Sequence, residues 1–169
     1  MPTPDITQDL ALLANQEESL VLASFGPDEA WQLGSRLRDL ARARGLAIVI
    51  DIRRFGQPYQ LLFYAALAGT TPDNARWVER KSNTVARFHR SSYSLGLKLQ
   101  LAAISFAEKY ALPDSDYATH GGSFPLSVTG AGIVGSLTVS GLPQRADHEL
   151  AVEALCLHTG RSYSDLKLP

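Results

Sequence analysis

Residues 119–142 read THGGSFPLSVTGAGIVGSLTVSGL and contain two candidate β-strands joined by a tight turn. Apolar residues alternate with other residues in Ser123–Val128 and again in residues 133–139, which is the period of a strand with one buried face. Because Gly-Ala-Gly at 130–132 separates the two, the stretch predicts an antiparallel hairpin. Gly135 falls inside the second strand, where a glycine marks a bulge or the close approach of another backbone or a ligand.

Composition is that of an ordinary globular chain. With 169 residues, 45% hydrophobic and 20% charged, the chain can bury a core as a single domain, residues 1–169. A net charge of −1 predicts no partnership with nucleic acid or an anionic membrane. The N-terminal residues show no signal-peptide pattern, and no apolar run approaches the ~20 residues of a membrane span. The single cysteine, Cys156, has the apolar setting of a buried thiol in a reducing compartment, so we expect a cytoplasmic protein.

The rest of the chain alternates between helix-like and strand-like segments. Helices are predicted around residues 10–18 and over 28–44, 72–90, 92–109 and 143–157, and strands over 19–25, 46–54 and 59–67. The turn at 56–58 leaves no room for a helix between its two strands, which argues against a parallel βαβ unit. The pattern predicts an α+β fold with a central antiparallel β-sheet of about five strands, flanked by α-helices.

The helix RWVERKSNTVARFHR, residues 76–90, is the most unusual segment electrostatically. It carries a local charge of +4, and Lys81 falls inside its apolar arc between Trp77 and Phe88. One interpretation is a solvated basic face, with Lys81 reaching past Trp77 to water. The other is a surface that faces an anion or carboxylate, in which Arg80 and Lys81 line a pocket or a subunit contact. Runs of charge are usually solvated, which favours the first interpretation.

Two further groups could bind a ligand. Asp51 and Arg53 share one face of a strand and need partners; an intramolecular ion pair is slightly favoured over a neighbouring subunit or a ligand. His120-Gly121-Gly122-Ser123 could present backbone N–H groups to an anion; the alternative, backbone geometry alone, is favoured more for the glycines than for His120. Neither a GxxxxGK[ST] loop nor a GxGxxG turn accompanies them, so nucleotide binding has weak support.

Catalytic and metal motifs are not evident. His89, His120, His148 and His158 do not have the spacing of a metal site. Ser140, Asp147 and His148 are the residue types of a hydrolase triad, but two of them are adjacent and no GxSxG elbow is present. Asp147 is instead expected to stabilise the N-terminus of the last helix.

The run HGGSFPLSV…GAGIVGSLTVSGLPQRADHELAVEAL resembles the haem-degrading domain family (GlcG/HbpS-like). The residues that carry this resemblance are Gly121, Gly122, Pro125, Gly135, Val139, Ser140, Gly141 and Asp147. The segments NQEESL (15–20), DIRR (51–54), AGTTPDNARWVERKSNTV (68–85), RFHRSSYSLG (87–96) and DHE (147–149) resemble one bacterial and fungal branch of that family. They are specific for the branch and not for an activity.

The resemblance implies a profilin-like fold, symmetric homo-oligomers and, in some relatives, the binding and degradation of haem. His89 and His120 could ligate haem iron. We therefore expect a cytoplasmic homo-oligomer that binds a small anionic ligand, with haem as one candidate, through basic groups that hold the anion and aromatic groups that pack its body. The candidate residues are Arg53, Trp77, Arg80, Lys81, His89, Tyr93, His120, Gly121, Gly122, Ser123 and Ser140. The alternatives are an oxidative haem-degrading enzyme at the same pocket and a structural or adaptor oligomer.

Overall fold

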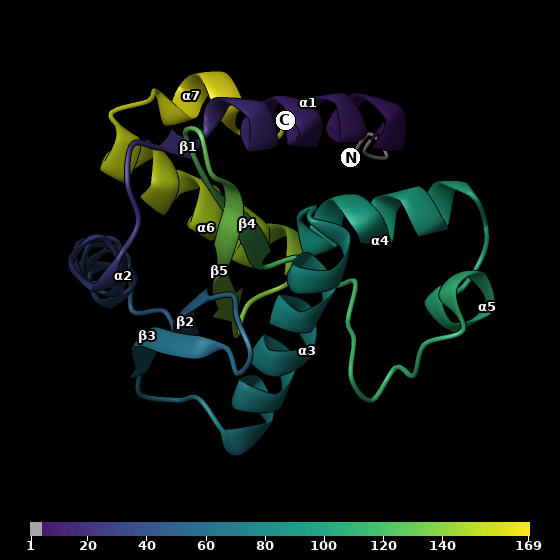
Figure 1. The fold of residues 1–169 in the computed structure, drawn as a ribbon, viewed down its shortest axis with the longest axis horizontal. Coiled ribbons are helices and arrows are strands. Elements are labelled where there is room, and N and C mark those ends of the chain that lie inside the picture. The colour runs from purple at the N-terminus through teal and green to yellow at the C-terminus, as the bar shows by residue number, and fades with distance from the viewer. Residues whose placement is uncertain (1–4) are drawn as a thin grey trace.

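A five-stranded sheet forms the centre of the computed structural model, which describes residues 5–169 (Figure 1). The strands are β1 (Val21–Leu22), β2 (Val49–Arg54), β3 (Gln60–Ala66), β4 (Ser123–Val128) and β5 (Gly132–Ser140). Their order is β1-β4-β5-β2-β3, and every pair is antiparallel except β1 with β4, which is parallel. The predicted α+β class, the strand number and both predicted hairpins are therefore confirmed, and the one parallel pair was not foreseen.

Helices cover this sheet and extend to one side of it. They are α1 (Ile6–Ser19), α2 (Pro27–Ala43), α3 (Pro72–Phe88), α4 (Ser92–Leu101), α5 (Phe106–Tyr110), α6 (Gln144–Thr159) and α7 (Tyr163–Leu166). Within residues 5–169, none of them combines the length and the apolar character needed to cross a membrane.

Two predicted elements were wrong in extent. The strand over 19–25 shrinks to two residues, because α1 continues to Ser19 and Gly26 already caps α2. The helix over 92–109 is two helices, since Ala103 adopts a left-handed φ of 49° and Ser105 opens α5 with a capping box to Glu108.

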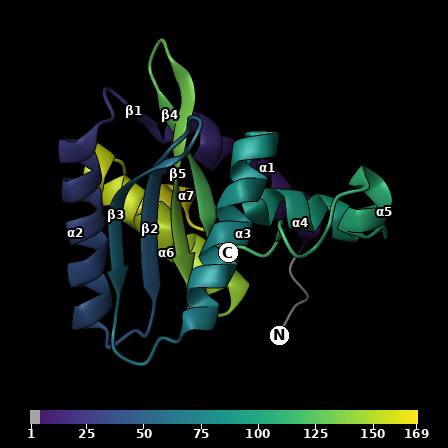
Figure 2. The ribbon, with the colours of Figure 1, turned by 60° about the horizontal axis from the view of Figure 1, so that its bottom comes forward.

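The two faces of the sheet differ in chemistry. Ile50, Phe124 and Leu137 lie on the face covered by α2 and α6, and with those helices they form the main apolar core. The opposite face lies under α3, and Figure 2 shows α3 and α6 on opposite sides of the strands. This face is polar: Thr138 of β5 pairs with Asp51 of β2 on one side and with Ser123 of β4 on the other. Because small polar side chains line the face, a helix can pack closely against it.

Candidate functional site

A cleft of about 240 Å³ lies between the first turns of α3 and the connection from β5 to α6. Its lining residues are Asp73, Asn74, Trp77, Lys81, His120, Ser140, Gly141, Leu142, Gln144 and Asp147. We call this space the Lys81 cleft. It brings together four side chains that the sequence put forward, namely Trp77, Lys81, His120 and Ser140.

Lys81 is the buried centre of this cleft. Its residue is only 3% exposed, and its Nζ donates to Asp147 Oδ2 at 2.9 Å and to the carbonyl oxygen of Val139 at 3.1 Å. Burial lowers the pKa of Lys81 and raises the pKa of Asp147, and the attraction between the two charges opposes both shifts. The interpretation of Lys81 as a side chain that reaches past Trp77 to water was wrong, because α3 turns this side chain toward the sheet.

Asp147 lies in the first turn of α6, as the sequence predicted, and it bonds to both Lys81 and the loop before the helix. Its Oδ1 accepts the N–H of Leu142 at 2.9 Å, and its Oδ2 accepts the Lys81 proton at 2.9 Å. Its pairing with Lys81 was missed. The available signal was Lys81 itself, because a lysine in the apolar arc of a helix requires a buried carboxylate nearby.

The twin glycines allow the hairpin to come this close. Gly122 has a φ of 130°, and a Cβ there would lie 2.3 Å from the Val139 carbonyl oxygen and 2.8 Å from Lys81 Nζ. A Cβ on Gly121 would lie 2.2 Å from the carbonyl oxygen of Gln144. The N–H of Gly121 donates to Gln144 Oε1, and the N–H of Ser123 donates to Ser92 Oγ. These N–H groups are therefore committed within the protein, which favours the geometric role of the glycines over anion binding.

Aromatic rings form the mouth of the cleft. The rings of Trp77 and His120 meet edge to face with centroids 4.8 Å apart, and the Arg80 guanidinium lies 4.6 Å from the Trp77 ring centroid. Desolvation, followed by the charges of Lys81 and Arg80, lowers the pKa of His120. Arg80 itself donates to the carbonyl oxygens of Asp114 and Tyr117, so it borders the cleft through Trp77 and does not line it.

Several predicted site residues lie elsewhere. The Arg53 guanidinium donates to both Asp51 oxygens, at 2.7 and 3.0 Å, which confirms the intramolecular ion pair. His89 is the C-cap of α3, twelve residues after Trp77, or about 18 Å along a helix. Tyr93 is buried and contacts Arg145, and the Ser123 hydroxyl bonds to Thr138 Oγ1. The expected single gathering of all basic and imidazole groups is therefore not formed within one protomer.

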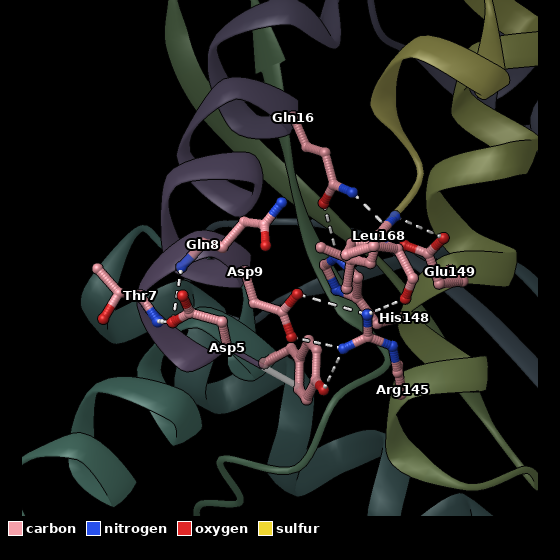
Figure 3. Close-up of polar contacts among 11 residues, drawn as sticks. Asp5, Thr7, Gln8, Asp9, Gln16, Arg145, His148, Glu149 and Leu168 are labelled. Carbon is pink, nitrogen blue, oxygen red and sulfur yellow. Dashed lines mark hydrogen bonds and ion pairs between the residues drawn. The ribbon is translucent and has the colours of Figure 1, made fainter. Parts of the chain in front are cut away.

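The triad residue types are also separated. Ser140 and Asp147 line the cleft, whereas His148 points toward α1, where its Nε2 lies 2.8 Å from Gln16 Oε1 (Figure 3). Within residues 5–169, no group of three or more His, Cys, Asp or Glu side chains is placed to hold a metal ion.

A second polar cluster fastens α1 to α6. Figure 3 shows Arg145 facing Asp9, and Gln16 between His148 and the C-terminal segment. Gln16 Nε2 donates to the carbonyl oxygen of Leu166 at 2.7 Å, and Glu149 Oε2 accepts the N–H of Leu168 at 3.2 Å. His148 is fully buried, and desolvation lowers its pKa to about 3.

Relatives of this chain share nearly its whole length. A UPF0303 protein of Paraburkholderia xenovorans is 58% identical over 164 residues, which is 97% of this chain and 98% of the relative. A UPF0303 protein of Burkholderia ambifaria is 60% identical over the same share of both chains.

Solved structures have the same architecture. The Ybr137w protein superimposes with a TM-score of 0.83 at 28% identity, covering 96% of this chain and 99% of that one. HbpS gives a TM-score of 0.62 at 18% identity, over 80% of this chain and 90% of HbpS. The PduOC:heme complex gives 0.66 at 17% identity, over 79% and 94%. The last two likenesses concern the fold alone.

The family comparison agrees with the resemblance drawn from the glycine hairpin. The family described as Haem degrading protein HbpS-like matches residues 25–156, from Phe25, just before α2, to Cys156 in α6. This range includes the sheet strands β2 to β5, α3 and the Lys81 cleft. The chain is therefore a member of the HbpS-like family of haem-degrading proteins.

Proposed function

We propose that this protein is a cytoplasmic homo-oligomer that binds a small ligand through an anionic group, a carboxylate or similar oxyanion, in the Lys81 cleft. The observation that carries the proposal is the buried ammonium of Lys81. A lysine ammonium has three donor protons, and two of them bond to Asp147 and Val139. Among residues 5–169 no third acceptor lies within hydrogen-bond distance, and Lys81 lines the cleft.

The remaining polar groups of the cleft favour an acceptor as ligand. Both oxygens of Asp147 are bonded, and one oxygen of Asp73 accepts the Trp77 indole proton at 3.1 Å. Gln144 Oε1 accepts the N–H of Gly121, which leaves the amide N–H₂ of Gln144 for another partner. The acceptors are thus largely used, while donors on Lys81, Gln144 and Ser140 remain. A ligand that supplies oxygen acceptors complements these unused donors.

Haem does not fit this cleft within one protomer. A volume of about 240 Å³ lies below the roughly 300–1,000 Å³ of pockets that enclose drug-sized ligands. His89, the other candidate for iron, lines a separate cavity with Glu17, Glu18 and Arg90, and Arg90 pairs with Glu17 at 2.9 Å. The size of the Lys81 cleft therefore favours a ligand smaller than haem.

Binding can be tested through the fluorescence of Trp77 at the mouth of the cleft. In a Trp31→Phe background, we expect saturable changes on titration with a series of small mono- and dicarboxylates. Replacing Lys81 alone leaves the Asp147 charge buried and unpaired, a cost of about 3–5 kcal/mol. The variant is therefore Lys81→Met combined with Asp147→Leu, which removes both charges together and is expected to stay folded without binding. Lys98→Met, at an exposed lysine of α4, is the matched control and should bind normally.

Two results would contradict the proposal. One is a carboxylate response that persists in the Lys81→Met/Asp147→Leu protein. The other is a stoichiometric Soret shift on addition of haemin that the double variant abolishes, because that would assign the cleft to haem.

A further inference from the structure

One carboxylate of the Lys81 cleft has no cationic partner. Asp73 lies in the first turn of α3 and lines the cleft. Its Oδ2 accepts the indole N–H of Trp77 at 3.1 Å, while its Oδ1 accepts no hydrogen bond from the described residues. No Lys, Arg or His among residues 5–169 forms an ion pair with it. Arg80 lies over the same indole, but its guanidinium donates to two loop carbonyl groups and not to Asp73.

The charges that line the cleft do not balance without a further cation. They are one ammonium, on Lys81, and two carboxylates, on Asp73 and Asp147. The ammonium is already paired with Asp147 at 2.9 Å. Since desolvation lowers the pKa of His120, its ring adds no charge near pH 7. A ligand with only negative charge therefore meets the unpaired carboxylate of Asp73, whereas a ligand that also carries a cationic group can pair with it.

The two recognition points are separated along α3. Asp73, Trp77 and Lys81 follow one another at intervals of four residues, so they lie on one ridge of the helix. Eight residues correspond to about 12 Å along the axis. Long helical side chains lean toward the helix N-terminus, which brings the Lys81 ammonium closer to Asp73 than this value. Trp77 lies between the two charged residues, and together with Leu142 it provides the large apolar side chains of the cleft.

We propose that the ligand of the Lys81 cleft is an ω-amino carboxylate, a zwitterion whose two charges are separated by an apolar chain. Its carboxylate accepts from Lys81, its ammonium donates to Asp73 Oδ1, and its chain packs on Trp77 and Leu142. A six-carbon chain has about the length of two extended residues, or roughly 7 Å. An α-amino acid carries both groups on the same carbon atom and can reach only one of the two recognition points. This inference rests on the proposed function, because it adds a cation site to the same anion site.

Three six-carbon acids test the recognition by calorimetric titration of the full-length protein at low ionic strength near pH 7. Hexanoate lacks the ammonium, 2-aminohexanoate carries it beside the carboxylate, and 6-aminohexanoate carries it at the far end of the chain. We expect 6-aminohexanoate to bind about three- to fivefold more tightly than either of the others, which is the effect of one solvent-accessible ion pair. An affinity for 6-aminohexanoate no greater than that for either other acid would overturn the inference.

Asp73→Asn identifies the group that binds the ammonium. Asparagine retains an oxygen for the Trp77 indole and removes only the charge. The preference for 6-aminohexanoate should therefore disappear, while hexanoate binds no more weakly than before. Asp28→Asn is the matched control, because Asp28 follows a proline in the first turn of α2 as Asp73 does in α3, and it should keep the full preference. A preference that persists in the Asp73→Asn protein would contradict the assignment.

The inference and the proposed function fail in different ways. If the wild type binds hexanoate, the Lys81→Met/Asp147→Leu protein does not, and no acid is preferred, then the anion site stands and the cation site is wrong. If none of the three acids binds to the wild type, the proposed function is wrong and this inference falls with it.

Discussion

His148 has no part in the proposed ligand site, and its burial predicts a contribution to the pH dependence of stability. Its ring is fully buried, its Nδ1 has no partner among residues 5–169, and its pKa is about 3. The unfolded chain takes up this proton near pH 6.5 and the native protein does not. Stability associated with neutral His148 is therefore complete above pH 6.5 and is lost as the pH falls toward 3.

Between pH 7 and pH 5 this single residue should lower the free energy of unfolding by about 2 kcal/mol. Urea unfolding at the two pH values measures the change. Glu149, whose pKa burial raises, acts in the opposite direction, so the informative quantity is the difference between wild type and His148→Gln. Glutamine retains a polar group toward Gln16 and does not titrate. Equal pH dependence in the two proteins would show that His148 is not the group responsible.

Ligand affinity should have its own pH dependence through His120. Burial and the nearby charges of Lys81 and Arg80 lower the pKa of His120, so the ring is neutral near pH 7, and its protonation in acid adds positive charge at the mouth of the cleft. The affinity for carboxylates, measured by Trp77 fluorescence, should therefore rise several-fold between pH 7 and pH 5. His120→Asn should bind with an affinity that does not rise over this range.

The sequence predicted which residues line the cleft better than it predicted the contacts that these residues make. Lys81, Trp77, His120 and Ser140 were all put forward, and they line one cleft. The association of Lys81 with Asp147 joins positions 66 residues apart, and no local pattern reports such a contact. Arg53 was included because its charge needed a partner, and Asp51 two residues earlier supplied it.

The close packing of β4 against β5 and Lys81 requires a backbone conformation at residue 122 that favours glycine. Gly122→Ala would combine a left-handed φ of 130° with a Cβ 2.3 Å from the Val139 carbonyl oxygen. We expect it to cost about 3 kcal/mol or more, since overpacking alone costs about 1–3 kcal/mol. Gly130→Ala, in the β4–β5 turn with a φ of 77° and open space around it, should cost only about 1 kcal/mol. Thermal unfolding of both variants compares them, and equal losses would contradict the close packing at Gly122.

Elements with strong local signals were predicted well. Both hairpins and α3 follow from alternation, turn glycines and the Thr71-Pro72 entry, all of which act within a few residues. The break between α4 and α5 was missed, because Leu99 and Phe106 pack in one small core and mimic a continuous helix. The parallel pairing of β1 with β4 could not be read locally, since its partners lie more than a hundred residues apart.

At the scale of the whole molecule, the two ends of the chain stabilise each other. Leu168 is buried against Leu13 of α1 and Leu97 of α4, and Figure 1 shows the C-terminus beside α1. Leu168→Ala should therefore lower the free energy of unfolding by about 2 kcal/mol and the melting temperature by about 4–8 °C. Leu157→Ala, at an exposed site, should change it by less than about 0.5 kcal/mol. Calorimetry of the two variants tests this, and a similar melting temperature for both would mean that the C-terminal segment contributes little.

The two edge strands of the sheet, β1 and β3, differ in length, and this affects which edge could accept a further strand. β1 contains only Val21 and Leu22, and an edge strand this short is a poor partner for a further strand. At the other end of the sheet order, β3 is seven residues long, so the two edges of the sheet differ in length. A design that lengthened β1 would give the sheet a long edge on both sides, which is the condition for strand addition at either end.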